Sequence, residues 1–318
     1  MEITTLIPGY KVKNIANLII GIANQTHKPK KIIISDDSNN FQFTSEFLNS
    51  QQYPLLKDIS IEFFKGPQNG AYENFKQLIK IWNHESELVH LMLDDDFIYP
   101  LFYEKHFLTH SSGNFSCSVS PRWSANHDGI PIRHQDVPDV IKFNSNKIIS
   151  MSKDIVFSTT AAECKNWLGE FSNTVMHKST CDLILKPELV QISYAGLWDL
   201  GYFINASQHN PIAYVNEYLS FFRLGGESNS SKIFGPHMKA AFLAYAALTR
   251  ASQKLNQITI EKEKENYLKL YHFIKTYYTN EIDLQELTDI IFSMSTDPDK
   301  YENEYIQSWN SFLSLHKL

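Results

Sequence analysis

The chain has 318 residues, 43% of them hydrophobic, which is enough for one large α/β domain with an appendage or for two modest domains. The formal net charge is -6, and no long block of lysine and arginine is present, so the sequence disfavours nucleic acid as a partner. There is no signal-peptide pattern and no apolar run of the ~20 residues that cross a bilayer, so we expect a cytoplasmic protein. The cysteines lack CxxC spacing, which predicts free thiols at Cys117, Cys164 and Cys181.

The first hundred residues alternate strand-like and helix-like segments, a pattern typical of a parallel sheet covered by helices. Strands are predicted at 4–8, 31–35, 59–64 and 88–93. Amphipathic segments predict helices at 12–23 and 43–48. A third helix is indicated by four apolar residues at i, i+3, i+4 and i+7, which form one buried face: Phe75, Leu78, Ile79 and Trp82.

The residues that follow each strand are the candidates for a binding site, because βαβ units place ligands outside the carboxyl ends of their strands. Polar or turn-forming residues follow all four predicted strands: Pro8-Gly9-Tyr10, Asp36-Asp37-Ser38, Gly66 to Asn69 and Asp94 to Asp96. Surface loops are polar in any case, so each group alone also fits a purely structural role.

The fourth strand leads into three consecutive carboxylates, Asp94, Asp95 and Asp96. Adjacent negative charges repel one another, and an apolar strand that ends in them indicates a ligand site that a cation completes. In extended backbone Asp94 and Asp96 would point the same way and Asp95 the other way. The alternative is a solvated loop or a helix cap, in which the carboxylates accept backbone N–H groups.

After residue 100 the pattern is less regular. Strands are predicted at 115–120, 140–143 and 212–222, and a helix at about 197–206. From Gly235 onward, apolar faces predict one helix after another. We place the boundary near Gly225-Gly226 and Gly235-Pro236. The expected domains are therefore 1–234, with halves 1–98 and 99–234, and a helical extension over 235–318.

In this order, the segments resemble the family 2 glycosyltransferases, which have the GT-A fold. The resemblance rests on Ile7-Pro8-Gly9-Tyr10 after the first strand, Asp36-Asp37 after the second, Asn69-Gly70 with Asn74, and Leu93-Asp94-Asp95-Asp96, followed by Pro100. It covers residues 3 to 230. It implies an α/β fold of the GT-A type, a mixed and mainly parallel sheet flanked by helices with a C-terminal helical extension. Residues 1–98 would bind the nucleotide sugar and residues 99–234 the acceptor.

The resemblance further implies a metal-dependent inverting glycosyltransferase that uses a UDP-sugar. Mn²⁺ or Mg²⁺ would be held by Asp94 and Asp96, with Asp96 the direct ligand, and would neutralise the diphosphate. Asp36 or Asp37 would accept a hydrogen bond from uracil, unless the two form an Asx-turn before the next helix. The remaining residues implied for the donor site are Pro8, Tyr10, Asn69, Asn74 and Asp95, with Tyr10 stacking on the base.

An inverting transferase also needs a general base for the acceptor hydroxyl. The family has an Asp or Glu at the start of a helix, and Asp199 fits that position, with Glu170 and Asp182 as rivals. This chain has Trp198-Asp199 where the family often has Glu-Asp, and Trp198 is either a sugar platform or part of the core. Arg223 would clamp phosphate, although Gly stands where the family has His and His237 is a distant substitute. The alternative is a surface pair of Arg223 with Glu217 or Glu227.

The implied acceptor is a glycan or a lipid-linked glycan, in the synthesis of bacterial surface polysaccharide, lipopolysaccharide or protein-linked glycan. Two other functions stay open: a sugar-phosphate nucleotidyltransferase, and a catalytically silent carbohydrate-binding or scaffold protein of the same fold. Nothing in the sequence matches the GxGxxG, Walker or GxSxG motifs. The helical extension could pack on the catalytic domain, form a homodimer or make peripheral contact with the inner face of the cell membrane.

Overall fold

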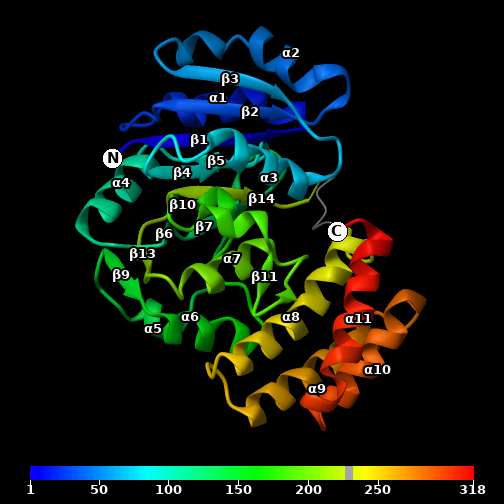
Figure 1. Cartoon of the computed structure of the whole chain (residues 1–318). Coiled ribbons are helices and arrows are strands. Elements are labelled where there is room, and N and C mark those ends of the chain that lie inside the picture. Colours follow the sequence, from blue (N-terminus) through cyan, green and yellow to red (C-terminus); the bar gives the residue numbers. More distant parts are fainter. Residues whose placement is uncertain (226–231) are drawn as a thin grey trace. The chain divides into compact units, whose positions relative to one another are not determined.

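The computed structural model describes residues 1–225 and 232–318, which form two compact units (Figure 1). Unit 1 comprises Met1–Ser152, Trp167–Lys186 and Ala206–Leu224, and unit 2 comprises Lys153–Asn166, Pro187–Asn205 and Gly225–Leu318. Unit 2 thus contains two segments from the middle of the chain besides its C-terminal part. The boundary that the sequence placed near Gly235 stays a prediction.

Within its described residues, unit 1 is built on a sheet of eight strands in the order β3-β2-β1-β4-β10-β6-β13-β9. The first four, seen in Figure 1 as stacked ribbons, are parallel, and β10 is antiparallel to β4 and to β6. Therefore β4 and β6 run in the same direction, and their carboxyl ends lie at the same edge of the sheet. The bounds are β1 Ile3–Gly9, β2 Lys31–Asp36, β3 Ser60–Lys65, β4 Leu88–Leu91, β6 Cys117–Val119, β9 Ile148–Met151, β10 Thr174–His177 and β13 Ile212–Val215.

The helices of unit 1 bury apolar faces, as their spacing predicts. They are α1 Ile15–Ala23, α2 Gln42–Asn49, α3 Ala71–Trp82 and α4 Phe102–Ser112. In α1, Ile15, Leu18, Ile19 and Ile22 are buried at i, i+3, i+4 and i+7 and join the core with β1 and β2. The four N-terminal strands and the three helices between them, predicted from the sequence, are confirmed. Cys117 and Cys181 are buried free thiols, and Cys164 is a half-buried one.

A second sheet of four strands, in the order β5-β14-β7-β8, begins directly after the three carboxylates. Its strands are β5 Phe97–Ile98, β7 Arg122–Ala125, β8 Pro131–His134 and β14 Ser220–Arg223. Strands β7 and β14 are parallel neighbours, and each of them carries an arginine. The single strand expected at 212–222 was wrong, because β13 ends before polar Asn216-Glu217 and the chain then enters this second sheet as β14.

The strand expected at 140–143 was also wrong. The segment is a short helix, α5 (Asp139–Lys142), which starts after Pro138. The apolar run suggested a buried strand, but Val140 and Phe143 are exposed and only Ile141 is buried. In a surface helix only the residues on one face are buried, and a segment of four residues is too short for this pattern to be distinguished from that of a strand.

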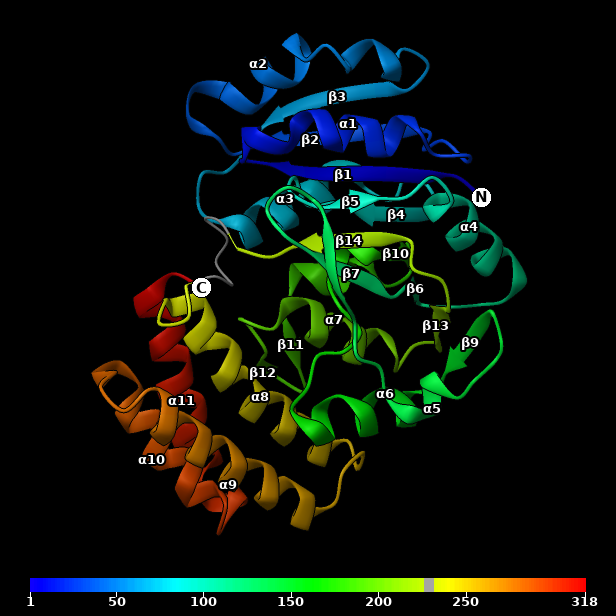
Figure 2. The ribbon, with the colours of Figure 1, turned by 180° about the vertical axis from the view of Figure 1, so that it is seen from behind.

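Unit 2 consists mainly of helices, as expected from Gly235 onward. They are α6 Lys153–Thr159, α7 Trp198–Ala206, α8 Pro236–Lys254, α9 Ile260–Tyr277, α10 Gln285–Met294 and α11 Pro298–His316, with a hairpin of β11 Glu188–Leu189 and β12 Ile192–Ser193 (Figure 2). The core contains Leu243, Tyr267, Ile291 and Trp309, and the Trp309 indole donates to the carbonyl of Ser193 at 2.9 Å. Among the described helices, none is long and apolar enough to cross a membrane.

Candidate functional site

The three carboxylates lie in a turn between the two sheets of unit 1. Strand β4 ends at Leu91, Asp94 and Asp95 form the turn, and β5 begins at Phe97. The extended backbone that we expected for these residues was therefore wrong, and strand alternation does not decide their directions. The reason is that the strand stops before the charges, and the turn lets each carboxylate contact a different neighbour.

Asp94 holds the loop that follows β1 in place through two hydrogen bonds. Its Oδ2 accepts the backbone N–H groups of Tyr10 at 2.7 Å and of Lys11 at 2.6 Å. Burial, together with repulsion from Asp95, raises the pKa of Asp94 to about 7 despite these hydrogen bonds. Pro8 is buried in β1, whereas Tyr10 is 63% exposed. Asp94 thus brings the end of β1 to the carboxylate turn.

Asp95 forms an ion pair with the side chain of Lys11. Burial alone would lower the pKa of Lys11, but the attraction of Asp95, Asp94 and Asp96 outweighs it and raises that pKa. The ammonium group therefore stays charged beside the carboxylate turn.

Asp96 is the most buried of the three, at 1% exposure. Its Oδ1 accepts the backbone N–H of Arg223 at 3.4 Å, and its Oδ2 has no hydrogen-bond partner among the described residues. Burial, with repulsion from Asp95 and Glu170, raises the pKa of Asp96 well above its ordinary value, and it does so against the opposing effects of the Ser172 hydroxyl and of the charge of Arg122. A buried carboxylate oxygen without a donor fits the role of a cation ligand.

The described residues contain no group of three or more His, Cys, Asp or Glu side chains arranged to hold a metal by themselves. This is compatible with a divalent cation of the Mg²⁺ type, which proteins often bind through one or two carboxylates while phosphates of the substrate and water supply the other ligands.

Arg223 lies in β14 and is buried beside the carboxylate turn. Its Nε donates to the carbonyl of Asp95 at 2.8 Å, and its Nη1 donates to the carbonyl of His127 at 3.1 Å. The alternative pair of Arg223 with Glu217 was wrong, because Glu217 pairs with Lys105 at 2.7 Å. The other alternative partner, Glu227, lies outside the described residues, as do Gly226 and Ser228 of the same motif.

Arg122 is a member of the site that the sequence analysis missed. It forms an ion pair with Glu170. The negative charge of Glu170 raises the pKa of Asp96, and the positive charge of Arg122 lowers it. The signal that could have found it is the strand-end rule, since Arg122 follows β6 by three residues and β6 runs parallel to β4. Glu170, considered above only as a rival base, precedes antiparallel β10 at the same edge.

Asp36 and Asp37 differ in their burial and in their hydrogen bonds. Asp36 is buried and forms an Asx-turn, with Oδ1 accepting the backbone N–H of Ser38 at 2.9 Å and Oδ2 that of Thr44 at 2.8 Å. Asp37 is half-buried and accepts the backbone N–H of Gln68. Asp36 therefore forms the Asx-turn that the sequence left open as an alternative, and a contact of either residue with a nucleotide stays a prediction.

Asn69 and Asn74 lie on either side of the start of α3. Asn69 is exposed in the loop before the helix. Asn74 is buried, and its Nδ2 donates to the carbonyl of Ser35 in β2 at 3.1 Å. Asn74 thus ties α3 to the strand that carries the Asp36-Asp37 pair, and Asn69 is the more accessible of the two.

The predicted base lies in unit 2. Asp199 is half-buried in the first turn of α7. Its neighbour Trp198 packs against the apolar core of that unit, with its ring 6.0 Å from the ring of His237 in α8. The rival Asp182 belongs to unit 1, where its exposed carboxylate lies 3.2 Å from His84. The assignment of Asp199 as the base stays a prediction.

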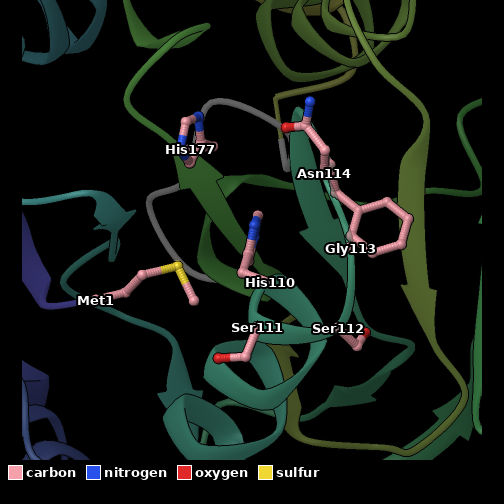
Figure 3. A pocket seen from close by; sticks show the side chains of 8 residues that line it. Met1, His110, Ser111, Ser112, Gly113, Asn114 and His177 are labelled. Atoms are coloured by element: carbon pink, nitrogen blue, oxygen red, sulfur yellow. The ribbon is translucent and has the colours of Figure 1, made fainter.

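A separate cavity of about 350 Å³ opens in unit 1 beside the amino end of β1. Figure 3 shows its lining side chains, which come from Met1, His177 and the last turn of α4 through Phe115. The three carboxylates follow β4, and Asp94 contacts the loop after the carboxyl end of β1, so this cavity, at the amino end of β1, is not part of the candidate site.

Comparison with solved structures identifies the fold. Residues 1–349 of TarS from S. aureus match with a TM-score of 0.59 and 11% identity, over 98% of this chain and 90% of that chain. The TarS complex with UDP-GlcNAc gives 0.58 at 12% identity, and the complex with UDP gives 0.56 at 10%, both with the same coverage. The expected α/β fold of the GT-A type, with its C-terminal helices, is confirmed. No protein-family model matches the chain, and no curated protein does.

Proposed function

We propose that this chain is a metal-dependent inverting glycosyltransferase, which transfers a sugar from a UDP-sugar to a hydroxyl of a glycan or lipid-linked glycan. The observation that carries the proposal is the buried Asp96, whose Oδ2 has no hydrogen-bond partner among the described residues, at the edge where β1 and β4 end. The shared fold supports it, because TarS has been solved with UDP and with UDP-GlcNAc.

The donor half of the proposed mechanism neutralises a departing diphosphate. Asp96, with Asp94 beside it, would hold Mn²⁺ or Mg²⁺, which supplies positive charge to the leaving group. Arg223 adds a fixed positive charge, and its Nη2 has no hydrogen-bond partner among the described residues. A guanidinium group already held by two carbonyls is well suited to bind a phosphate oxygen without further ordering.

The nucleotide would lie against the ends of β1 and β2. The exposed ring of Tyr10 is available to stack on the base, and Asp37 is available to accept a hydrogen bond from the uracil N–H. Asn69 lies in the exposed loop that follows β3, where it can contribute a further polar contact.

The acceptor half needs a base, for which we propose Asp199. Asp199 lies in the first turn of α7, the part of a helix where the family has its base. It would take the proton from the acceptor hydroxyl as that oxygen attacks the anomeric carbon.

The direct test is UDP release from a panel of UDP-glucose, UDP-galactose and UDP-GlcNAc with Mn²⁺. We expect release with at least one donor, loss of release in Asp96→Ala, and a fall of roughly 100-fold or more in Asp199→Asn. Asp182→Asn, with its exposed carboxylate, serves as the matched control and should retain the rate.

The two alternative functions give different results in the same assays. A nucleotidyltransferase would release pyrophosphate from a nucleoside triphosphate and a sugar phosphate. A silent carbohydrate-binding protein would release no UDP, and its Asp96→Ala variant would keep its affinity for the glycan. Either result would contradict the proposed transfer reaction.

A further inference from the structure

A half-buried ion pair lies close to the carboxylate turn. Arg122, the first residue of β7, pairs through Nη2 with Oε1 of Glu170, which precedes β10. Ser172, two residues after Glu170, accepts the backbone N–H of Leu93. Strand β7 pairs with β14, whose Arg223 donates its backbone N–H to Asp96. The pair therefore lies near the carboxylate that we propose as the cation ligand.

Both partners are held in place from several directions. The backbone N–H of Glu170 donates to Oδ1 of Asn173 at 2.6 Å, and Nδ2 of Asn173 donates to the carbonyl of Ser120 at 2.6 Å. The guanidinium of Arg122 lies over the ring of Phe222, at 5.2 Å. Gly169 has φ of +109°, and a Cβ there would meet Nη1 of Arg122 at 2.8 Å, so glycine is required beside the pair. Such fixing is typical of a group that must meet a ligand in one orientation.

Among the described residues, each partner of the pair has one polar atom without a hydrogen bond. Within the described residues, Nε of Arg122 and Oε2 of Glu170 are buried and have no hydrogen-bond partner. Of the side chains as wholes, 17% of Arg122 and 18% of Glu170 is exposed, so a ligand would contact the pair through atoms other than these two. The guanidinium supplies donors and the carboxylate supplies acceptors, a combination that fits a ligand which both gives and takes hydrogen bonds.

The chemistry of the pair selects among the parts of a nucleotide sugar. A diphosphate offers only acceptors and negative charge, so it cannot donate a hydrogen bond to Glu170, and the negative charge of Glu170 repels it. A sugar hydroxyl can donate to the carboxylate, and a neighbouring hydroxyl can accept from the guanidinium. Because the ion pair carries no net charge, it is suited to a neutral, hydroxyl-rich ligand.

We propose that Arg122 and Glu170 recognise the hydroxyl groups of the sugar that is transferred. This inference rests on the proposed function, and it adds the residues that distinguish one UDP-sugar from another. The sugar is attached to the phosphate next to the cation, so the groups adjoining Asp96 are the ones that it meets. The two residues would set which donor binds, whereas Asp37 and Tyr10 would bind the nucleotide that all UDP-sugars share.

The test compares UDP with UDP-sugars in the full chain. Calorimetric titrations with Mn²⁺ give the Kd of UDP and the Kd of the best donor among UDP-glucose, UDP-galactose and UDP-GlcNAc. We expect Glu170→Gln to keep the Kd of UDP within about twofold and to weaken the UDP-sugar by about tenfold or more, the range for losing a hydrogen bond to a charged group. Arg122→Lys should act in the same direction, since lysine cannot reproduce the planar donor set.

Two controls separate a recognition role from a structural one. Glu217→Gln changes the ion pair of Glu217 with Lys105, which lies elsewhere in unit 1, and should leave both Kd values unchanged. Glu170→Asp keeps the charge but shortens the side chain. It should therefore fold even if Glu170→Gln does not fold, and it should still weaken the binding of the UDP-sugar more than the binding of UDP. Mn²⁺ binding, measured by paramagnetic resonance, should be unaffected in all of these variants.

Three results would overturn the inference: equal weakening of UDP and UDP-sugar, no change in either, or loss of Mn²⁺ binding in Glu170→Gln. A wild-type chain that binds neither UDP nor any UDP-sugar would instead contradict the proposed function itself. The two failures are distinguishable, because the first is seen in the variants and the second in the wild type.

Discussion

At the scale of single residues, His90 links the strand that leads to the carboxylates with the segment that follows Glu170. Its Nδ1 lies 3.0 Å from the hydroxyl of Tyr103, and its Nε2 lies 3.0 Å from the carbonyl of Ser172. The Ser172 hydroxyl in turn accepts the backbone N–H of Leu93 at 3.0 Å. Burial lowers the pKa of His90 to about 3, so the ring is neutral near pH 7 and carries one N–H proton. A carbonyl can only accept, so that proton is on Nε2, and Nδ1 accepts from Tyr103.

This burial predicts a loss of stability in acid. Below pH 6.5 the unfolded chain binds a proton at His90 and the folded chain does not, so the unfolding free energy falls as the pH drops from 6.5 towards 3. The effect at pH 5 is roughly 2 kcal/mol. In urea unfolding, the loss between pH 7 and pH 5 should be smaller by about that amount in His90→Gln than in the wild type. The exposed His272→Gln should behave like the wild type, and an equal loss in all three proteins would refute the assignment.

At the scale of elements, the close approach of α7 to Tyr194 fixes the helix that carries Asp199. A Cβ added at Gly201 would lie 2.1 Å from a ring atom of Tyr194, so the helix can lie there only with glycine. Gly201→Ala should destabilise unit 2 by about 1–3 kcal/mol and lower the rate of transfer. Gly21→Ala in α1 is the matched control, since its Cβ would meet its nearest atoms at 3.4 Å and alanine favours helix. Urea unfolding of both variants checks this, and equal effects would contradict it.

The elements also show where sequence reasoning succeeded. Strands β1 to β4 were predictable because each is a short β-branched or apolar run that ends in a turn signal, and α3 because its apolar spacing is regular over three turns. Residues 140–143 were not, because one buried residue in four fits a strand and a helix equally. The backbone at Asp94 to Asp96 was missed because a turn depends on what each carboxylate contacts, namely Lys11, Arg223 and the backbone after β1, which lie far away in sequence.

The candidate site was predictable in the same uneven way. Asp96 and Arg223 were found because they follow strands or belong to a motif with a fixed order. Arg122 was missed because its position beside Asp96 depends on β10, which inserts between β4 and β6 in the opposite direction. No local pattern in the sequence gives that strand order. Asp36 could not be separated from Asp37, because only the contacts with Ser38 and Thr44 show which one forms the turn.

At the scale of the whole molecule, a buried arginine joins three helices of unit 2. Arg250 in α8 lies 3.2 Å from Glu263 in α9 and 2.6 Å from Glu302 in α11. The side chain of Glu263 has no exposed surface, so removing its partner leaves a buried charge uncompensated. Arg250→Met should therefore cost about 3–5 kcal/mol in the unfolding of unit 2.

The control for this prediction is an exposed pair in the same unit. Lys275 in α9 lies 3.2 Å from Asp289 in α10, and both side chains are well exposed. Lys275→Met should cost less than about 1 kcal/mol, because water screens the pair. Chemical denaturation followed by circular dichroism measures the free energy of unfolding of both variants. Similar losses in the two would show that the ion pairs of Arg250 stabilise unit 2 no more than an exposed pair does.

The central claim is that Asp96 and a divalent cation together bind the diphosphate of a nucleotide. The most direct measurement is a calorimetric titration of UDP into the full chain, with and without Mn²⁺, for the wild type and for Asp96→Asn. We expect the wild type to bind UDP at least about tenfold more tightly with Mn²⁺ than without it, and Asp96→Asn to lose this gain while it unfolds no earlier than the wild type. UDP binding that is independent of Mn²⁺, or a full gain from Mn²⁺ in Asp96→Asn, would contradict the claim.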